Sequence, residues 1–388
     1  MKRFLLFAMT GCLIAGFAVT VFGGGNQDWK QVKVGLKKNL RGVHFLDSEN
    51  GWIVGDKGTI LHTSDGCKTW TTVDAGVSAV LRGVDFVDKK EGWVVGGGSR
   101  IVKGGSMFEG RNMVGQDGIA ILHTTDGGKT WERQRSGINN FTFWNVDMID
   151  AKKGWIVTGI GKEHPDGHWN KTTDGGKRWS FPPQAYLRPA RPLFDVCFVD
   201  AKHGWCVGYR GRIEFQGAFV GMLKLEKDGP VLHTSDGGNT WEVQNPGTPL
   251  GSFLCGVSFT DKKTGWVVGE KGTIYHTTDA GKTWKQQKSG TKKTLRDVAF
   301  VDEKTGCAVG DGGTILTTTD GGKKWKLWSK VTDNDLRAVS FPDKEMCFVV
   351  GDKGTALQRK FSKLSKPSTS STSVKPSKPS TSSKPKWR

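Results

Sequence analysis

Four arginines occupy equivalent positions in a repeated stretch of the sequence and could bind an anion. Each follows a leucine and opens a segment such as LRGVDFVD, which begins at Leu81. The four are Arg41, Arg82, Arg296 and Arg337. A guanidinium can hold a carboxylate or a phosphate through two parallel hydrogen bonds. Trp144, Phe194 and Cys255 take the same position in three further copies, so a surface shared by all copies would be half cationic and half apolar.

A second recurring motif, (Ser/Thr)-x-Asp-x-Gly-x-x-Trp, brings a carboxylate to a tight turn. The Asp can accept hydrogen bonds from backbone N–H groups of its own turn, the Gly can adopt a positive φ, and the Trp can bury its ring between sheets. The six aspartates are Asp65, Asp126, Asp174, Asp236, Asp279 and Asp320. Cys67 takes the glycine position of the first copy, which predicts a strained or different turn there. We interpret these Asp boxes as structural and assign no catalytic residue.

Histidines and acidic residues do not predict a metal centre. One set of histidines shares a repeat position, so its members lie on different repeats and cannot converge on one ion. They are His62, His123, His233 and His276. Residues 163–168, EHPDGH, are the one place where metal-ligand side chains gather, and their spacing matches no metal motif. We therefore expect no metal and no cofactor.

The segments that carry these residues recur along the chain with one basic period. They start at Leu40, Leu81, Phe143, Leu193, Leu254, Leu295 and Leu336. Three of the six intervals between successive starts are equal, and the other three are longer, as insertions would make them. The shared interval matches the usual length of a propeller repeat, and four short strands in each copy are typical of a propeller blade. The sequence predicts an all-β fold, a seven-bladed β-propeller with four antiparallel strands per blade.

The two ends of the chain are predicted to close the ring. The seventh copy has no Asp box and therefore lacks its fourth strand. Trp29 precedes Leu40 by the same interval that separates Trp284 from Leu295, the start of the sixth copy. The segment at Trp29 should complete the last blade, which removes exposed sheet edges. We expect one propeller domain over residues 24–358.

The segments outside this domain predict export to the periplasm or the cell exterior. Residues 1–23 combine a basic start with an apolar run, as a secretory signal peptide does. An uncleaved membrane anchor is the alternative, because the run approaches the length that spans a bilayer. Residues 359–388 form a Ser/Thr/Pro/Lys-rich tail that holds nine positive charges, out of a formal net charge of +19. Such a tail cannot build a packed core. We expect a solvated spacer, with attraction to an anionic surface as the alternative.

Export makes nucleic acid an unsuitable partner and permits disulfides. The six cysteines beyond residue 23 share no repeat position, so no disulfide framework is predicted. Cys197 and Cys206 lie on neighbouring strands and could face each other, although free thiols are the simpler interpretation.

Insertions gather on one face of the predicted ring. Alternating strands place all Asp boxes on one face, and the second-to-third loops and the blade connections on the other. The insertions on this second face are Gly97–Gly118, Ile160–Trp169, Ser180–Pro192 and Tyr209–Pro230. Binding residues commonly lie on loops of a rigid scaffold, so we expect the arginines, Trp144 and Phe194 to form a partner-binding channel mouth on this insertion face. The alternatives are neutral insertions and arginines paired with loop aspartates.

The repeats resemble the photosystem II assembly-factor family of seven-bladed propellers, which are built from BNR, or Asp-box, repeats. The resemblance covers nearly all of residues 27–358. It rests on LR-x-V-x-F at Leu295, GW-x-VG at Gly265, GTI at Gly272 and TTDGGKTW at Thr124. It implies an exported, non-catalytic scaffold, here expected to be monomeric, that binds a subunit of a membrane complex during assembly; in photosynthetic members that complex is photosystem II. The long insertions depart from the family pattern and leave the client open.

The main alternative is a glycan-active or glycan-binding protein, because Asp boxes also occur in sialidases. A sialidase needs a Tyr nucleophile, an arginine cluster and an acid/base carboxylate. The chain holds Tyr186, Tyr209 and Tyr275. Tyr275 is a repeat strand position, and the sequence around Tyr186 is not the sialidase entry motif. We therefore predict that the chain is not an enzyme.

Overall fold

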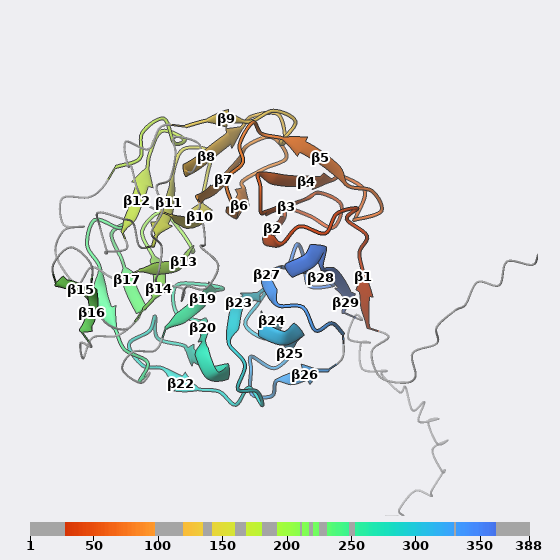
Figure 1. Ribbon diagram of the computed structural model, residues 1–388. Coiled ribbons are helices and arrows are strands. Elements are labelled where there is room, and N and C mark those ends of the chain that lie inside the picture. Colours follow the sequence, from red (N-terminus) through yellow and green to blue (C-terminus); the bar gives the residue numbers. More distant parts are fainter. Residues whose placement is uncertain are drawn as a thin grey trace, which may run out of the picture.

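The repeats fold into sheets that radiate from a central axis, as Figure 1 shows. The computed structural model describes residues 28–97, 119–134, 142–159, 168–180, 192–209, 212–216, 220–224, 231–247, 253–329 and 331–361. Seven sheets of the repeat type surround the axis, and each is named here as a blade, numbered in chain order. The predicted seven-bladed, all-β propeller is confirmed.

Each blade runs from an innermost strand outward. Blade 1 comprises β2 (Leu40–Phe45), β3 (Gly51–Gly55), β4 (Thr59–Thr63) and β5 (Thr71–Asp74). Blade 2 comprises β6 (Leu81–Phe86), β7 (Gly92–Gly97), β8 (Ile119–Thr124) and β9 (Glu132–Arg133). Blade 3 comprises β10 (Phe143–Met148), β11 (Gly154–Thr158) and β12 (Trp169–Thr172). Blade 4 comprises β13 (Leu193–Phe198), β14 (Gly204–Gly208), β17 (Val231–Thr234) and β18 (Glu242–Gln244).

The remaining blades follow the same order. Blade 5 comprises β19 (Leu254–Phe259), β20 (Gly265–Gly269), β21 (Ile274–Thr277) and β22 (Lys285–Gln286). Blade 6 comprises β23 (Leu295–Phe300), β24 (Gly306–Gly310), β25 (Thr314–Thr318) and β26 (Lys326–Trp328). Blade 7 comprises β27 (Leu336–Ser340), β28 (Met346–Gly351), β29 (Ala356–Lys360) and, at its outer edge, β1 (Trp29–Gln31).

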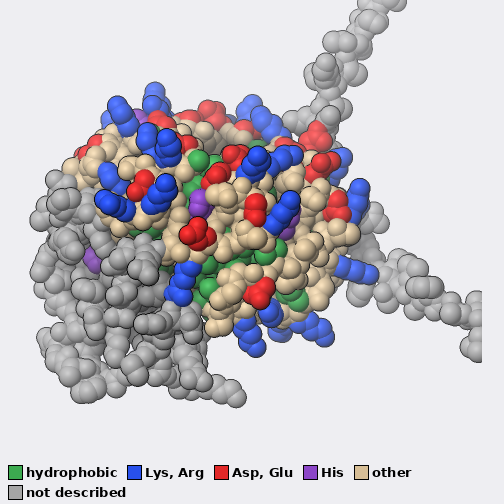
Figure 2. Space-filling view, turned by 90° about the horizontal axis from the view of Figure 1, so that it is seen from above, with side chains coloured by type: hydrophobic (Ala, Val, Ile, Leu, Met, Phe, Trp, Pro, Cys, Tyr) green, Lys and Arg blue, Asp and Glu red, His purple; other side chains and the backbone are tan. Residues whose placement is uncertain are grey.

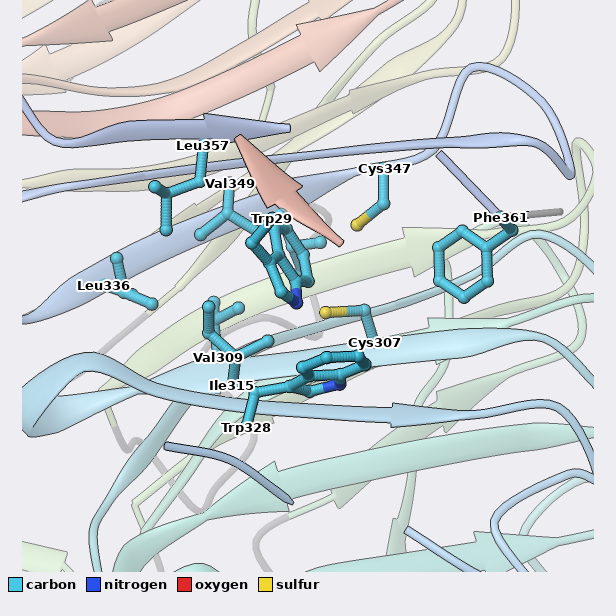
Figure 3. Packing of buried hydrophobic residues seen from close by; sticks show 11 residues of the cluster. Trp29, Cys307, Val309, Ile315, Trp328, Leu336, Cys347, Val349, Leu357 and Phe361 are labelled. Carbon is cyan, nitrogen blue, oxygen red and sulfur yellow. The ribbon is translucent and has the colours of Figure 1, made fainter. Parts of the chain in front are cut away.

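The ring closes at β1, as the spacing of Trp29 predicts. β1 pairs antiparallel with β29, and Trp29 lies opposite Arg359. The indole of Trp29 is buried in an apolar cluster that also holds Trp328 and Phe361 (Figure 3). The guanidinium of Arg359 lies 4.5 Å from the centroid of the Trp328 ring and 4.2 Å from that of Phe361. The first strand of the chain is therefore fastened to the last by backbone pairing and by packing.

Two features depart from the expected four strands per blade. Blade 3 has three strands in the part of the chain that the structure describes, and Ser180 adds a single bridge to Lys171. The insertion of blade 4 contains a separate hairpin of β15 (Arg212–Gln216) and β16 (Val220–Lys224). The other insertions lie largely outside the described residues.

A repeated aromatic stack joins neighbouring blades. At four joints the buried Trp of the second strand stacks on the Phe that ends the innermost strand of the next blade, as at Trp266 and Phe300, whose ring centroids are 3.5 Å apart. At the joint between blades 2 and 3, Met148 takes the place of that Phe and packs in one cluster with Trp93. The Trp266 Nε1–H also donates to the carbonyl of Gly321, in the Asp box of that blade. The glycine of the motif is required, because a Cβ on Gly306 would lie 2.5 Å from the Phe300 ring. The His276 ring stacks on the other face of the Trp266 indole, with the ring centroids 4.6 Å apart. The recurring histidines therefore have a structural role, as expected.

The joint between blades 6 and 7 is built differently. Cys307 takes the Trp position of blade 6, and Cys347 takes the Gly position of blade 7. Both thiols are buried in the cluster around Trp29, as Figure 3 shows. The six cysteines from Cys67 onward are free thiols. Cys206 lies opposite Val196 and packs in a different cluster from Cys197, so these two do not face each other.

Candidate functional site

The innermost strands of the seven blades surround a central cavity of about 360 Å³. The residues of the arginine position all line it: Arg41, Arg82, Trp144, Phe194, Cys255, Arg296 and Arg337. The structure therefore brings together every residue that we proposed for the channel mouth. Their side chains are neither fully buried nor fully exposed.

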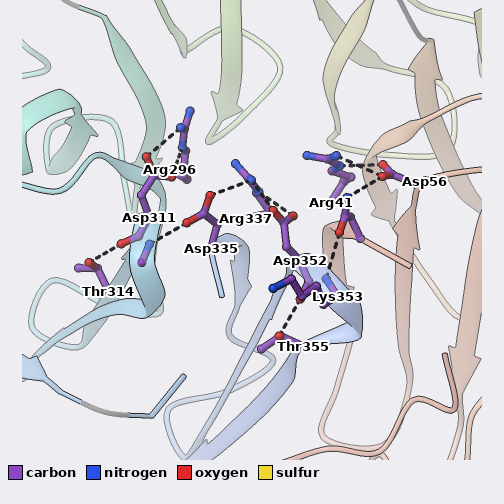
Figure 4. Close-up of polar contacts among 12 residues, drawn as sticks. Arg41, Asp56, Arg296, Asp311, Thr314, Asp335, Arg337, Asp352, Lys353 and Thr355 are labelled. Carbon is purple, nitrogen blue, oxygen red and sulfur yellow. Dashed lines mark hydrogen bonds and ion pairs between the residues drawn. The ribbon is translucent and has the colours of Figure 1, made fainter. Parts of the chain in front are cut away.

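Three of the four arginines are already paired within the chain (Figure 4). Arg41 donates to both carboxylate oxygens of Asp56, at 2.8 and 3.2 Å. Equivalent two-bond pairs join Arg296 to Asp311 and Arg337 to Asp352. Burial raises the pKa of Asp56, but the hydrogen bonds and charge of Arg41 outweigh this and hold it below its ordinary value. The alternative interpretation, a pair with a nearby loop aspartate, is correct for these three arginines.

Arg82 is the exception in the mouth. The residue that follows the second strand in blades 1, 6 and 7 is aspartate, whereas in blade 2 the corresponding position is Gly97. The guanidinium of Arg82 lies 4.4 Å from the centroid of the Trp144 ring, and its buried Nε has no hydrogen-bond partner in the part of the chain described. Burial, with the nearby charge of Arg41, lowers the pKa of Arg82 to about 10. At neutral pH this side chain is still a cation, and it lacks a paired anion among the described residues.

The apolar half of the mouth is a continuous aromatic arc. The Trp144 and Phe194 rings meet edge to face with centroids 5.3 Å apart, and the Phe194 and Phe253 rings do so at 5.9 Å. Phe253 also lines the cavity, although it was not predicted from the sequence. Its position directly before the Leu254 strand start was the available signal. Arg82 thus lies at one end of an arc formed by Trp144, Phe194 and Phe253.

Carboxylates farther along the innermost strands also line the cavity and form hydrogen bonds between neighbouring blades. Each accepts a hydrogen bond from a backbone N–H of the next blade: Asp85 from Met148, Asp147 from Phe198, Asp195 from Val257, and Asp297 from Val339. Burial raises the pKa of Asp195 to about 6 and that of Asp297 to about 8. Burial, with the neighbouring charge of Asp85, raises the pKa of Asp147 well above its ordinary value.

Hydroxyl and imidazole groups complete this set of inter-blade contacts. Ser258 accepts the N–H of Phe300, and Ser340 accepts the N–H of Phe45, both at 3.0 Å. His44 lies 3.1 Å from Asp85. Every one of the seven joints therefore has a polar side chain that reaches across it. These residues were not predicted from the sequence, where they alternate with the apolar residues of the innermost strands.

The Asp boxes have the structural role that the sequence predicts. Asp126 Oδ1 accepts the backbone N–H groups of Lys129 and Thr130 at 3.0 Å, and Oδ2 accepts the Thr130 hydroxyl at 2.6 Å. The hydrogen bonds from Thr130, the largest influence, help to hold the pKa of Asp126 at about 2. Cys67 adopts a φ of 70°, so its turn keeps the box geometry in a conformation that favours glycine. These turns join the third and fourth strands and lie on the opposite face of the ring from the channel mouth.

Neither a metal centre nor a membrane-crossing helix is found among the described residues. No group of three or more His, Cys, Asp or Glu side chains in them could hold an ion. No helix there is long and apolar enough to cross a bilayer. Of the 163–168 cluster, residues 163–167 lie outside the described part of the chain.

These features define a seven-bladed Asp-box propeller with a polar and aromatic channel mouth. The family described as photosynthesis system II assembly factor YCF48 matches residues 24–104, 184–292 and 284–360, and the BNR/Asp-box repeat matches residues 122–133. These matches span more than half of the sequence. The chain belongs to the YCF48 family of photosystem II assembly factors.

Solved structures show the same fold. A structure of YCF48 bound to a D1 peptide is 20% identical and has a TM-score of 0.61, over 87% of this chain and 98% of that one. YCF48 from Cyanidioschyzon merolae is 21% identical, with a TM-score of 0.62, over 86% and 99%. The GH74 xyloglucanase of Xanthomonas campestris is 16% identical, with a TM-score of 0.57, over 86% of this chain and 53% of the enzyme.

A curated relative comes from a different functional class. A sialidase of Bacteroides fragilis strain YCH46 is 24% identical over 158 residues, and the match covers 33% of this chain. It spans only 29% of the length of that sialidase.

Proposed function

We propose that this chain is an exported, non-catalytic scaffold that assists the assembly of a membrane protein complex. It does so by holding an acidic and partly apolar segment of a protein client in the channel mouth. The observation that carries this proposal is Arg82, a cation without an anion in the described chain, at the edge of an aromatic arc. The related structure of YCF48 bound to a D1 peptide supports a protein client from a membrane complex.

The chemistry of the mouth suits such a segment. A cation removed from water without a partner is costly, so a client carboxylate that reaches Arg82 would restore the missing hydrogen bonds. The Trp144 ring lies against the guanidinium, at 4.4 Å from its centroid. Phe194 and Phe253 can bury apolar client side chains beside it. The paired arginines contribute less, because each already holds a carboxylate.

The first test compares Arg82→Gln with a matched variant, Arg296→Gln, by isothermal titration with the D1 peptide of the related complex. Arg82→Gln should weaken binding by about tenfold or more, because a charge-assisted hydrogen bond is lost. It should leave the melting temperature unchanged, since no carboxylate of the described chain loses a partner. Arg296→Gln should instead lower the melting temperature, because it leaves Asp311 unpaired, and should weaken binding less. Equal peptide affinity in wild type and Arg82→Gln would refute the proposed site.

A glycan ligand is the second candidate, because of the sialidase match and the aromatic arc. Tyr209 and Tyr275 are buried and do not line the cavity, so neither is placed as a nucleophile; Tyr186 lies outside the described residues. Release of a fluorescent aglycone from a sialoside or a xyloglucan oligosaccharide would support the enzyme. If the protein instead binds the D1 peptide and releases no aglycone, the scaffold is favoured.

A further inference from the structure

Three lysines on the insertion face adopt a backbone conformation that disfavours lysine. Lys57, Lys271 and Lys353 have φ values of 58°, 55° and 56°. Each is exposed at the tip of the turn between the second and third strands of its blade, in an Asp-Lys-Gly or Glu-Lys-Gly sequence. Residues other than glycine, asparagine and aspartate rarely occupy this left-handed region.

The architecture imposes this conformation. In each turn the lysine is followed by a glycine that lies under the connection to the next blade. A Cβ on Gly58 would be 1.8 Å from the carbonyl oxygen of Val77, and one on Gly354 would be 2.0 Å from that of Leu36. The turn must therefore be tight. The equivalent tip residue of blade 6 is Gly312, with a φ of 61°. Glycine is the residue that this left-handed backbone conformation favours.

The ammonium groups of these lysines form no ion pair with the other described residues. Blade 6 supplies its cation from a neighbouring loop instead, since a Cβ on Gly312 would lie 3.6 Å from the Nζ of Lys293. Blades 5, 7 and 1 thus each carry a lysine at the turn tip, and Lys293 lies beside the equivalent tip of blade 6. We name Lys57, Lys271, Lys293 and Lys353 the lysine crescent.

The crescent adds positive charge to this rim. The arginines of blades 6, 7 and 1 are neutralised locally by Asp311, Asp352 and Asp56, whereas the crescent lysines are exposed and unpaired within the described residues. Figure 2 shows one side of the ring, where Lys and Arg are mixed with Asp and Glu along one rim and gather at the visible part of the opposite rim. Glu270 and Asp333 are carboxylates on this side that pair with no arginine of the described chain, so the excess of positive charge is moderate.

We propose that the lysine crescent binds an acidic stretch of the protein client that continues outward from the channel mouth. The proposal rests on the proposed function, because it assigns a second contact to the same client. Around the ring, Lys271, Lys293, Lys353 and Lys57 lead in order from blade 5 to blade 1, and Arg82 follows in blade 2. A flexible lysine is a point charge that tolerates variable acidic sequences.

The test uses the triple variant Lys57→Gly, Lys271→Gly and Lys353→Gly. The probes are fluorescein-labelled D1 peptides extended at either end by four glutamates or, as a matched control, by four glutamines. Wild type should bind one glutamate-extended peptide about fivefold or more tightly than its glutamine counterpart at low salt, and this preference should fade as salt rises. The triple variant should lose the preference, while its melting temperature rises by about 2 °C or more because strain is relieved.

Gly312→Lys is the converse variant. It adds a cation and a strained residue to blade 6, so it should strengthen the glutamate preference and lower the melting temperature. The crescent proposal is wrong if the triple variant keeps the full preference for the glutamate-extended peptide. It is also wrong if the triple variant keeps that preference and loses only its binding to anionic phosphatidylglycerol vesicles, measured in parallel. If Arg82→Gln weakens the unextended peptide while the triple variant changes nothing, the channel-mouth proposal survives and the crescent does not. If neither variant changes any affinity, both fail.

Discussion

At the scale of single residues, one repeat position carries different chemistry because its neighbours differ. The arginine of the innermost strand is neutralised wherever aspartate follows the second strand, as Asp56 does for Arg41. Where glycine follows, as in blade 2, Arg82 keeps a charge that no described residue pairs and lies against Trp144. The residue that follows the adjacent strand therefore decides whether the arginine forms an ion pair within the described chain or is left to bind a ligand.

Asp126→Ala tests the structural role of the Asp boxes. The substitution leaves the Lys129 and Thr130 N–H groups without their acceptor, and we expect a loss of about 1 kcal/mol in unfolding free energy, since these donors are exposed to water. Urea denaturation measures the loss. Peptide affinity should be unchanged in the folded fraction, and a selective loss of binding with full stability would contradict the structural role.

At the scale of elements, the blade joint is the unit that repeats. Each regular joint combines a buried Trp, a stacked Phe and a glycine that leaves room for the ring, as at Trp266, Phe300 and Gly306. The joint between blades 6 and 7 replaces the Trp and the Gly with Cys307 and Cys347, and Trp29, Trp328 and Phe361 supply the apolar volume there. The chain thus changes both sides of one contact together.

Trp266→Ala should be far more damaging than Trp284→Ala. Trp266 is fully buried between blades 5 and 6, and its loss leaves a cavity that we expect to cost about 3–5 kcal/mol. Trp284, the Trp of an Asp box, is only partly buried and contacts Phe259 edge to face. Differential scanning calorimetry of the two variants gives the comparison, and equal effects would show that the stack is not the main inter-blade contact.

At the scale of the whole molecule, a ring depends on its closure. The short strand β1 pairs the N-terminal segment with blade 7. Two further hydrogen bonds cross the same joint, from the Phe45 N–H to Ser340 and from the Lys353 N–H to Asn39. Trp29 contributes buried apolar area to the same contact, and Arg359 packs on two aromatic rings beside it.

Deleting residues 24–38 should destabilise the ring severely, because blade 7 would lose its outer strand and the buried Trp29. Deleting residues 365–388 should leave the melting temperature unchanged, since that segment is expected to be a solvated tail. Thermal unfolding followed by circular dichroism distinguishes the two truncations. A full-length melting temperature in the first truncation would show that closure does not depend on β1.

The buried carboxylates predict that stability falls as pH rises from about 5 to 9. Burial raises the folded-state pKa of Asp195 to about 6 and of Asp297 to about 8. The folded ring therefore holds protons that the unfolded chain releases near pH 4. The stability from these protons is complete below that pH and is lost as pH rises through 6 and then 8. The Asp-box carboxylates affect stability in a lower pH range, because the pKa of Asp126 is held at about 2. Their contribution is lost as the pH falls from about 4 toward 2.

Asp297→Asn is the matched variant for this pH profile. The amide keeps the shape and one acceptor oxygen but cannot ionise, so the melting temperature of the variant should depend less on pH between 7 and 9. A profile identical to that of wild type would show that Asp297 does not titrate in this range.

The sequence by itself determined the blades, their number and their closure, because these features are local or strictly repeated. The Asp boxes, the GWxVG segments and the offset of Trp29 from Leu40 each report on a short stretch of chain. The shared position of the arginines also followed, since equivalent residues of a ring of repeats must point to one axis.

Tertiary structure alone decided which side chains are paired and which are free. Asp85 and Asp195 accept N–H groups that lie 63 and 62 residues further along the chain, and no local pattern marks such partners. Arg82 and Lys57 depend in the same way on backbone from another strand or blade connection. Pairing, burial and turn strain are set by distances between blades, and insertions of different length separate those blades in the sequence.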